Sequence, residues 1–222
     1  MAKRARIPSN QRAAGDVPPE TGSRPAAHVT SLDEARSAAL ECQACSLWQY
    51  ATQTVFGDGG PRAALMLVGE QPGDSEDRTG KPFVGPAGHV LDRALREAGI
   101  AREAVYVTNA VKHFKYVPRG KRRLHKKPAE AEIDACHQWL EREFVAPRLI
   151  VALGSTAARA LLGRPTPVEA NRGRLLSPPG ARAKLLITVH PSALLRMPDE
   201  YKAEAYRRFV AVLRVAADYV GS

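Results

Sequence analysis

The chain has 222 residues, with 33 Lys and Arg against 23 Asp and Glu and a formal net charge of +10 at pH 7. With 44% hydrophobic and 25% charged residues, its composition is globular and excludes wholesale disorder, a collagen-like repeat and a coiled coil. No apolar run approaches the ~20 residues of a membrane span, and the N-terminus lacks the apolar core of a signal peptide. We therefore expect a soluble, intracellular protein, and the positive charge favours an acidic partner such as a nucleic acid.

The first predicted feature is a tail. Residues 1–29 are rich in Ala, Pro, Gly, Ser and Arg without a hydrophobic period, which predicts a disordered basic tail before one domain over residues 30–222. Ser31 followed by Glu34 is a capping-box pattern, and it predicts a helix through about Glu41.

From Ala63 onward, short apolar runs alternate with helical segments. Four runs are too short for amphipathic helices and predict strands buried on both faces, namely Ala63–Gly69, Val105–Val111, Arg148–Gly154 and Leu185–His190. Apolar positions three and four apart predict helices at Gly88–Ala98, Ala129–Phe144, Ser155–Leu162 and about Glu200–Tyr219. This alternation predicts an α/β fold whose mostly parallel sheet is covered by helices on both sides.

The candidate site lies where these strands end, because open parallel sheets bind ligands beyond their carboxyl edge. The segment Glu70–Asp74, with Phe83 after it, presents acids and an aromatic ring on an irregular backbone; a turn with solvated acids and a buried ring is an equal alternative. His190 follows another strand, where a ligand-binding and a structural histidine are equally good interpretations. Arg196 can reach either a phosphate or a helix end.

The segment Lys112–Lys127 holds eight Lys or Arg and no acid, interleaved with Phe114 and Tyr116. Such a density of cations neutralises phosphates and releases counterions, so the segment favours contact with nucleic acid over a merely solvated loop. His125 lies within it. A neutral imidazole can be a base, a nucleophile or a ligand, or have no role.

The three cysteines are too few for a disulfide framework. Cys42 and Cys45 have C-x-x-C spacing, and Cys136 with His113 would complete four ligands of a metal centre. Buried free thiols are the alternative that the spacing alone favours.

Several spaced motifs resemble those of the iron–sulfur uracil-DNA glycosylases of family 4. They are Gly69–Asp74, Pro82–Gly88, Val107–Asn109 and His190–Ser192. Two further segments, Ala110–Lys115 and Lys121–His125, are similar to the UdgX branch, whose hallmark is a Lys-Arg-Arg-Ile-His loop; here Leu124 stands in the place of Ile. The resemblance runs from about Cys42 to Arg214.

This resemblance implies an α/β/α sandwich of three layers with a central four-stranded parallel sheet, and excision of uracil from DNA. By position it implies a [4Fe–4S] cluster whose ligands are Cys42, Cys45, His113 and Cys136. It also implies a monomer that acts on uracil-containing DNA, with single-stranded DNA favoured, in the bacterial cytoplasm at the nucleoid and without a membrane.

The resemblance also implies how a flipped uracil is recognised. Phe83 would stack on the base, Asn109 would use its amide as donor and acceptor on the O4 and N3–H edge, and His190 would donate to O2. Gln71 and Asp74 would line the same pocket with backbone and side-chain groups. The expected DNA contacts are Lys121, Arg122, Arg123 and Arg196.

In the UdgX branch the loop histidine captures the sugar at C1′, and His125 is the matching position. Glu70 would orient or deprotonate His125, or position water, so the implied catalytic residues are His125, Glu70 and His190. Two alternatives remain: a conventional glycosylase that releases a free abasic site while His125 only binds DNA, and a non-catalytic iron–sulfur protein that binds DNA.

Overall fold

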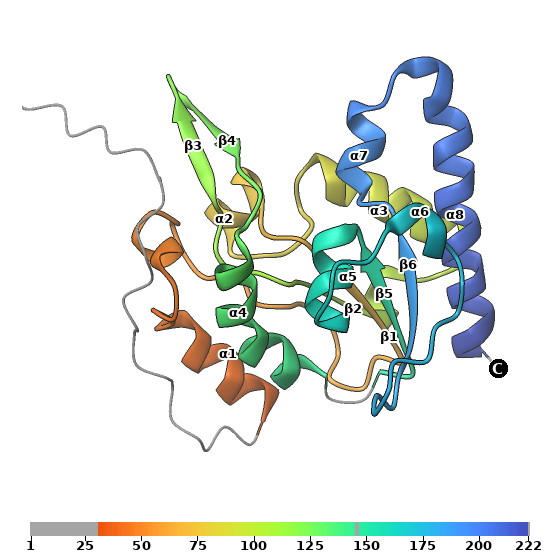
Figure 1. The fold of residues 1–222 in the computed structure, drawn as a ribbon, viewed down its shortest axis with the longest axis horizontal. Coiled ribbons are helices and arrows are strands. Elements are labelled where there is room, and N and C mark those ends of the chain that lie inside the picture. The colour runs from red at the N-terminus through yellow and green to blue at the C-terminus, as the bar shows by residue number, and fades with distance from the viewer. Residues whose placement is uncertain (1–30, 145–146, 222) are drawn as a thin grey trace, which may run out of the picture.

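The computed structural model describes residues 31–144 and 147–221, so the predicted basic tail lies outside the described residues. Within them, a central sheet lies between two layers of helices (Figure 1). The strands are β1 (Leu65–Gly69), β2 (Val105–Asn109), β3 (Tyr116–Arg119), β4 (Arg122–His125), β5 (Leu149–Leu153) and β6 (Lys184–Thr188). The α-helices are α1 (Leu32–Leu40), α2 (Asp74–Thr79), α3 (Pro86–Glu97), α4 (Glu130–Glu143), α5 (Ser155–Leu162), α6 (Val168–Asn171), α7 (Pro191–Arg196) and α8 (Asp199–Gly221).

The main sheet of the described residues has four parallel strands in the order β2-β1-β5-β6. Every residue of β1, β2 and β5 is buried, as their continuously apolar sequences require when helices cover both faces. The predicted α/β fold with a central four-stranded parallel sheet is thereby confirmed. The register pairs Gly69 with Asn109, which aligns the carboxyl ends of the two strands that begin the site.

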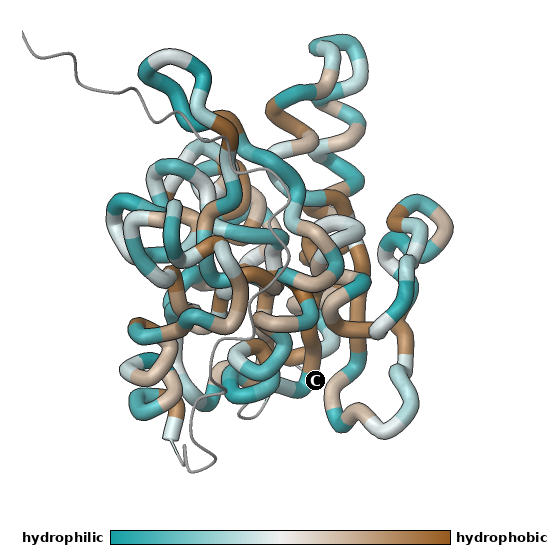
Figure 2. The backbone as a smooth tube through the Cα atoms, turned by 60° about the vertical axis from the view of Figure 1, so that its left-hand side comes forward, coloured by the Kyte–Doolittle hydropathy of each residue, from teal (hydrophilic) through white to brown (hydrophobic). Residues whose placement is uncertain are grey.

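The two faces of the sheet support separate cores. One joins alternate strand residues such as Leu67 and Val151 to α3 and α8. The other joins Met66 and Ile150 to α4 and α5. Figure 2 shows the hydrophobic segments concentrated along the central strands. The helix at α1 begins with the predicted capping box, since Ser31 and Glu34 exchange hydrogen bonds of 3.1 Å.

The basic segment is where the sequence-based expectation of a loop is wrong. Residues 116–125 form an antiparallel hairpin, β3–β4, in which Tyr116 pairs with His125, and it projects from the rest of the domain (Figure 1). Gly120 adopts a left-handed φ of 59° in the tight two-residue turn, a conformation that favours glycine. The residues before the hairpin, Lys112–Lys115, are buried.

None of the helices in residues 31–144 and 147–221 is long and apolar enough to cross a membrane.

Candidate active site

A cleft of about 950 Å³ lies at the carboxyl edge of the sheet. Of the residues predicted for function, it is lined by Glu70, Gln71, Asp74, Phe83, Asn109, His125, His190 and Arg196. These residues come from the ends of β1, β2 and β6, from α2 and the segment between α2 and α3, from α7, and from the hairpin. Lys121, Arg122 and Arg123 do not line the cleft. The structure thus brings together side chains that are far apart in the sequence.

The floor of the cleft depends on Gly69, the last residue of β1. A Cβ atom at this position would lie 2.3 Å from Asn109 Oδ1 and 2.6 Å from Phe83 Cζ. Both side chains therefore lie directly against the backbone of β1, closer than any larger residue permits. Asn109 and Phe83 are themselves buried, so neither has room to withdraw.

Replacing Gly69 by Ala should therefore displace Asn109 and Phe83. We expect catalytic activity in this cleft to fall by about 100-fold, the effect of a misplacement near 1 Å, with a loss of stability of about 1–3 kcal/mol from overpacking. Single-turnover kinetics and urea unfolding measure the two effects. The matched control is Gly60→Ala, because a Cβ at Gly60 meets nothing within 4 Å; equal effects of the two substitutions would contradict the argument.

Phe83 occupies a strained backbone conformation. Its φ is 56°, which is costly for an aromatic residue and is maintained only where the surroundings enforce it. Gly88 provides part of that enforcement, because a Cβ there would lie 1.8 Å from the Phe83 carbonyl oxygen. The ring faces His190 with 5.9 Å between centroids and 28° between planes. The strain thus keeps a flat aromatic surface beside His190.

His190 is held as a neutral hydrogen-bond donor. It caps α7, and its Nδ1 accepts a hydrogen bond of 3.2 Å from the backbone N–H of Ser192, which places the ring proton on Nε2. Burial is the main cause that lowers the pKa of His190 to about 4; Glu70 opposes the shift, and the nearby His125 and Arg196 add to it. Near pH 7 the residue can therefore donate from Nε2 without carrying a charge.

The depressed pKa of His190 predicts how stability depends on pH. Because the unfolded chain binds the proton near the ordinary pKa of 6.5 and the folded chain only near 4, the folded state loses stability as the pH falls through this interval. At 1.36 kcal/mol per pKa unit, the loss across the whole interval is about 3 kcal/mol. Urea unfolding of His190→Asn, which keeps a capping side chain, should show a smaller loss between pH 7 and 4.5; parallel pH profiles would contradict the assignment.

Glu70 and His125 form a pair across the mouth of the cleft. His125 Nε2 lies 3.1 Å from Glu70 Oε1, and the buried Thr156 at the start of α5 donates to Glu70 Oε2. Burial raises the pKa of Glu70, but the hydrogen bonds to His125 and Thr156 outweigh it and hold the pKa below its ordinary value. The carboxylate is therefore ionised at neutral pH and aimed at the imidazole. Thr156 is not among the residues predicted from the sequence, although it lies just after the carboxyl end of a predicted strand, β5.

Gln71 differs in part from its predicted role. Its side-chain Nε2 donates to the carbonyl oxygens of Lys115 (3.0 Å) and Lys126 (3.1 Å), and its Oε1 accepts from the N–H of Lys115 at 3.1 Å. The amide group therefore ties together the two ends of the hairpin. Gln71 lines the cleft, and its side chain positions the element that carries His125.

Asp74 and Arg123 are also paired with each other. Asp74 accepts hydrogen bonds from Arg78 at 2.9 Å and from Arg123, and the contact with Arg78 is the main cause that holds the pKa of Asp74 below its ordinary value. Arg123 points toward α2, whereas Lys121 and Arg122 are exposed on the hairpin. Arg196 is exposed at the rim of the cleft. Of the four predicted DNA contacts, three are therefore exposed cations. The fourth, Arg123, is instead paired with carboxylates of α2.

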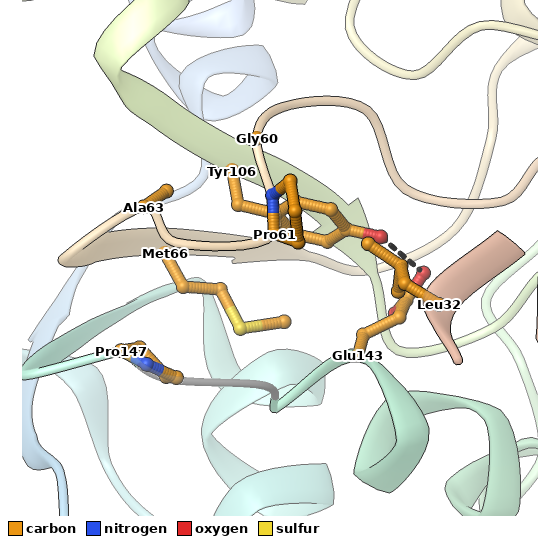
Figure 3. A pocket seen from close by; sticks show the side chains of 8 residues that line it. All are labelled: Leu32, Gly60, Pro61, Ala63, Met66, Tyr106, Glu143 and Pro147. Atoms are coloured by element: carbon orange, nitrogen blue, oxygen red, sulfur yellow. Dashed lines mark hydrogen bonds between the residues drawn. The ribbon is translucent and has the colours of Figure 1, made fainter. Parts of the chain in front are cut away.

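Behind the cleft, Lys112 and Glu143 form a fully buried ion pair. Lys112 Nζ lies 2.5 Å from Glu143 Oε2 and also donates to the carbonyl oxygen of Asn109 at 2.8 Å. The Tyr106 hydroxyl donates to the same carboxylate at 3.3 Å (Figure 3). The pair therefore supports the backbone that presents Asn109.

The four residues implied as cluster ligands are all buried, namely Cys42, Cys45, His113 and Cys136. His113 Nε2 lies 2.9 Å from Thr54 Oγ1, whose hydroxyl donates to the carbonyl of Ala39. Thr54 therefore accepts the proton of Nε2, while His113 Nδ1 is buried without a hydrogen-bond partner. An anchored imidazole with one free nitrogen is the usual arrangement of a metal-ligating histidine.

The three buried thiols are also suited to binding iron. A hydrogen bond from Cys136 lowers the pKa of Cys45 to about 5, with His113 contributing and burial opposing the shift; the thiolate is the form that binds iron. Trp139 Nε1 donates to Cys42 Sγ at 3.0 Å. No group of three or more His, Cys, Asp or Glu in the described ranges is arranged for a single metal ion. A cluster of four irons instead holds its ligands around a larger centre, and the donor set fits such a group.

Beside this cleft lies a basic hairpin, and the cleft holds an uncharged donor histidine and an ionised carboxylate. Together with the parallel sheet, these features define an α/β enzyme suited to chemistry on nucleic acid. Residues 56–214 match the uracil DNA glycosylase superfamily, and the chain belongs to that superfamily.

Relatives of known type support the same placement. A type-4 uracil-DNA glycosylase of Sulfurisphaera tokodaii is 33% identical over 180 residues, which cover 77% of this chain and 79% of the relative. The type-4 enzyme of Thermotoga maritima is 40% identical over 159 residues, 70% of this chain and 79% of the relative. That of Archaeoglobus fulgidus is 33% identical over 187 residues, 79% of this chain and 90% of the relative.

Proposed function

We propose that this protein excises uracil from DNA by cleaving the N-glycosidic bond and is then trapped covalently on the abasic sugar through His125. The observation that carries the trapping is the contact of 3.1 Å between His125 Nε2 and the ionised Glu70, at the mouth of a cleft that contains Asn109 and His190. Membership of the superfamily and the type-4 relatives support the excision.

Recognition of the base uses Phe83 and Asn109. The glycosidic bond is inaccessible in a duplex, so the nucleotide is flipped out or taken from a single strand. Uracil stacks on Phe83, and the Asn109 amide accepts from N3–H and donates to O4. Cytosine reverses this hydrogen-bond pattern, which leaves buried polar groups unpaired and rejects the wrong base.

Cleavage of the bond moves its electron pair onto uracil N1. Negative charge then grows on the uracil O2, where the neutral His190 donates from Nε2. The sugar becomes an oxocarbenium ion with its positive charge near C1′. The ionised Glu70 stabilises this cation electrostatically, so the carboxylate and the histidine act on opposite charges of one transition state.

Capture of the sugar needs a lone pair on His125 Nε2. Glu70 Oε1 takes the proton of the Nε2–H that faces it at 3.1 Å as Nε2 attacks. The electron pair left on Nε2 then forms the bond to C1′. The transferred proton neutralises Glu70, so the alkylated imidazole is left uncharged, and release of the product would need a second nucleophile.

The hairpin would hold the DNA strand near this nucleophile. Lys121 and Arg122 are exposed and suited to phosphates. We propose that the partner is uracil-containing DNA, single-stranded DNA favoured, bound by a monomer at the bacterial nucleoid. A projecting hairpin is compatible with an extended strand, which supports this preference.

Cys42, Cys45, His113 and Cys136 would hold a [4Fe–4S] cluster. When bound, the cluster supplies a structural cross-link between the segment after α1, the residues before the hairpin and α4. The iron content and brown colour of anaerobically purified protein test this ligand set, and their absence would refute it.

The test of function is an incubation with uracil-containing single-stranded DNA, followed by denaturing electrophoresis with and without hot alkali. A shifted band that resists heat and detergent is expected for the trapped enzyme. DNA cleaved by alkali without a shifted band would instead identify a conventional turnover glycosylase, and unchanged DNA would leave only a binding protein.

A further inference from the structure

Arg123 lies on β4 but is directed into the protein. Its side chain is 16% exposed, and its Nη1 donates to Asp77 Oδ2 at 2.6 Å while Nε donates to Asp74. Asp77 is fully buried, so its charge depends on partners of this kind. The planar guanidinium thus joins the hairpin to two carboxylates of α2.

Further contacts fix the orientation of this guanidinium. Nη1 also donates to Thr52 Oγ1 at 3.2 Å, and Nη2 donates to the carbonyl oxygen of Asp74 at 3.4 Å. Its Cζ lies 5.4 Å from the ring centroid of Phe114 and 5.1 Å from that of Tyr116, within the range of cation–π attraction. A DNA phosphate could reach Arg123 only by displacing two carboxylates that repel it.

The clamp that Arg123 forms with α2 acts close to His125. Residues 123 and 125 are two apart in one strand and so face the same side of the hairpin. His125 pairs with Tyr116, and its ring centroid lies 6.3 Å from that of Phe114. Gln71 holds the hairpin at its ends, and Arg123 holds it partway toward the tip. Together with the hydrogen bond of 3.1 Å from the Tyr116 hydroxyl to the Tyr50 carbonyl oxygen, these attachment points prevent the hairpin from pivoting.

We infer that Arg123 is a positioning residue which decides whether the sugar is captured by His125 or by water. This inference rests on the proposed trapping. Capture requires the attacking atom within ~3–3.5 Å of C1′ in the correct direction, whereas water needs no such positioning. If the hairpin loses its attachment to α2, the side chains at the strand ends that act in bond cleavage stay in place. Only His125, the proposed nucleophile, moves.

The experiment compares Arg123→Gln with the matched control Arg122→Gln, which removes one charge from the exposed neighbour. For each, the ratio of covalent adduct to free abasic site is measured by denaturing electrophoresis, and the salt dependence of DNA binding is measured separately. In Arg123→Gln we expect the ratio to fall by about tenfold or more with an unchanged salt slope. In Arg122→Gln we expect an unchanged ratio and a slope reduced by about 1.

Two further variants keep the inference testable if Arg123→Gln does not fold. Arg123→Lys keeps the charge but not the fork geometry, and Asp77→Asn weakens one arm of the clamp from the α2 side. Both should lower the ratio, by less than Arg123→Gln, in protein whose melting curve remains cooperative. Wild-type ratios in all three variants would overturn the inference, as would a reduced salt slope in Arg123→Gln with an unchanged ratio.

A second measurement separates this inference from the proposed function. The NMR signals of the His125 ring should shift or broaden in Arg123→Gln and remain as in the wild type in Arg122→Gln. If the wild type forms no adduct, the trapping proposal fails, and this NMR comparison alone decides whether Arg123 positions His125. Unchanged ring signals in Arg123→Gln would then overturn the positioning role.

Discussion

Replacing His125 by Ser should reduce the covalent protein–DNA adduct to undetectable levels while a free, alkali-labile abasic site accumulates. The serine hydroxyl is shorter than the imidazole and cannot keep the contact that places Nε2 3.1 Å from Glu70. In the proposed mechanism, uracil departure depends instead on His190, Asn109 and Phe83, which this substitution leaves in place. Denaturing electrophoresis with and without hot alkali measures both products on the same gel.

The matched control for this prediction is His137→Ser. His137 also pairs with a carboxylate, at 3.2 Å from Glu141, but on an exposed face of α4 outside the cleft. It should form the adduct like the wild type. A persistent adduct in His125→Ser would exclude His125 as the nucleophile, and loss of the adduct in both variants would point to general damage rather than to removal of the attacking group.

The layers of the fold could be predicted because burial on both faces leaves a local signal. The expected strands at 105–111 and 148–154 include β2 and β5, and the expected helix Ser155–Leu162 has the bounds of α5. The predicted bounds are least accurate at the strand ends, because the apolar run of the sequence continues beyond the strand into the residues of the site. Ala110 and Val111, for example, are buried but lie beyond β2.

The parts of the site that could not be predicted from the sequence depend on contacts between segments that are distant in the chain. The composition of residues 112–127 predicts a basic loop that contacts nucleic acid, yet Lys112 and Lys115 are buried and Arg123 is largely covered. Their partners, Glu143, Glu132 and Asp77, lie on α4 and α2, and no local pattern joins them to this segment. Charge density therefore predicted a DNA-binding surface, but not which of its cations are structural.

Lys112 is the extreme case of a cation whose role the sequence conceals. It lies between Asn109, whose carbonyl oxygen it binds, and the neighbouring His113 of the proposed cluster site. Its partner Glu143 also accepts hydrogen bonds from Gly57 N–H at 2.8 Å and from Thr108 Oγ1. The pair therefore connects α4 to the end of β2, where Asn109, the residue proposed to recognise the base, lies.

Replacing Lys112 by Met should lower the free energy of unfolding by about 3–5 kcal/mol, because it leaves the fully buried Glu143 carboxylate without its cation. The double variant Lys112→Met with Glu143→Gln should recover part of this loss, since no unpaired buried charge remains. Urea unfolding of the purified protein measures each value, and a double-mutant cycle isolates the coupling between the two residues.

The control is the exposed ion pair between Arg207 and Glu204, whose side chains are 70% and 60% exposed. Arg207→Met should change the free energy of unfolding by less than about 1 kcal/mol, because solvent screens the charges. An equally small effect of Lys112→Met would show that Glu143 is neutralised by protonation or by its other donors. In that case the carbonyl of Asn109 would not depend on Lys112, and base recognition in the variant should match that of the wild type.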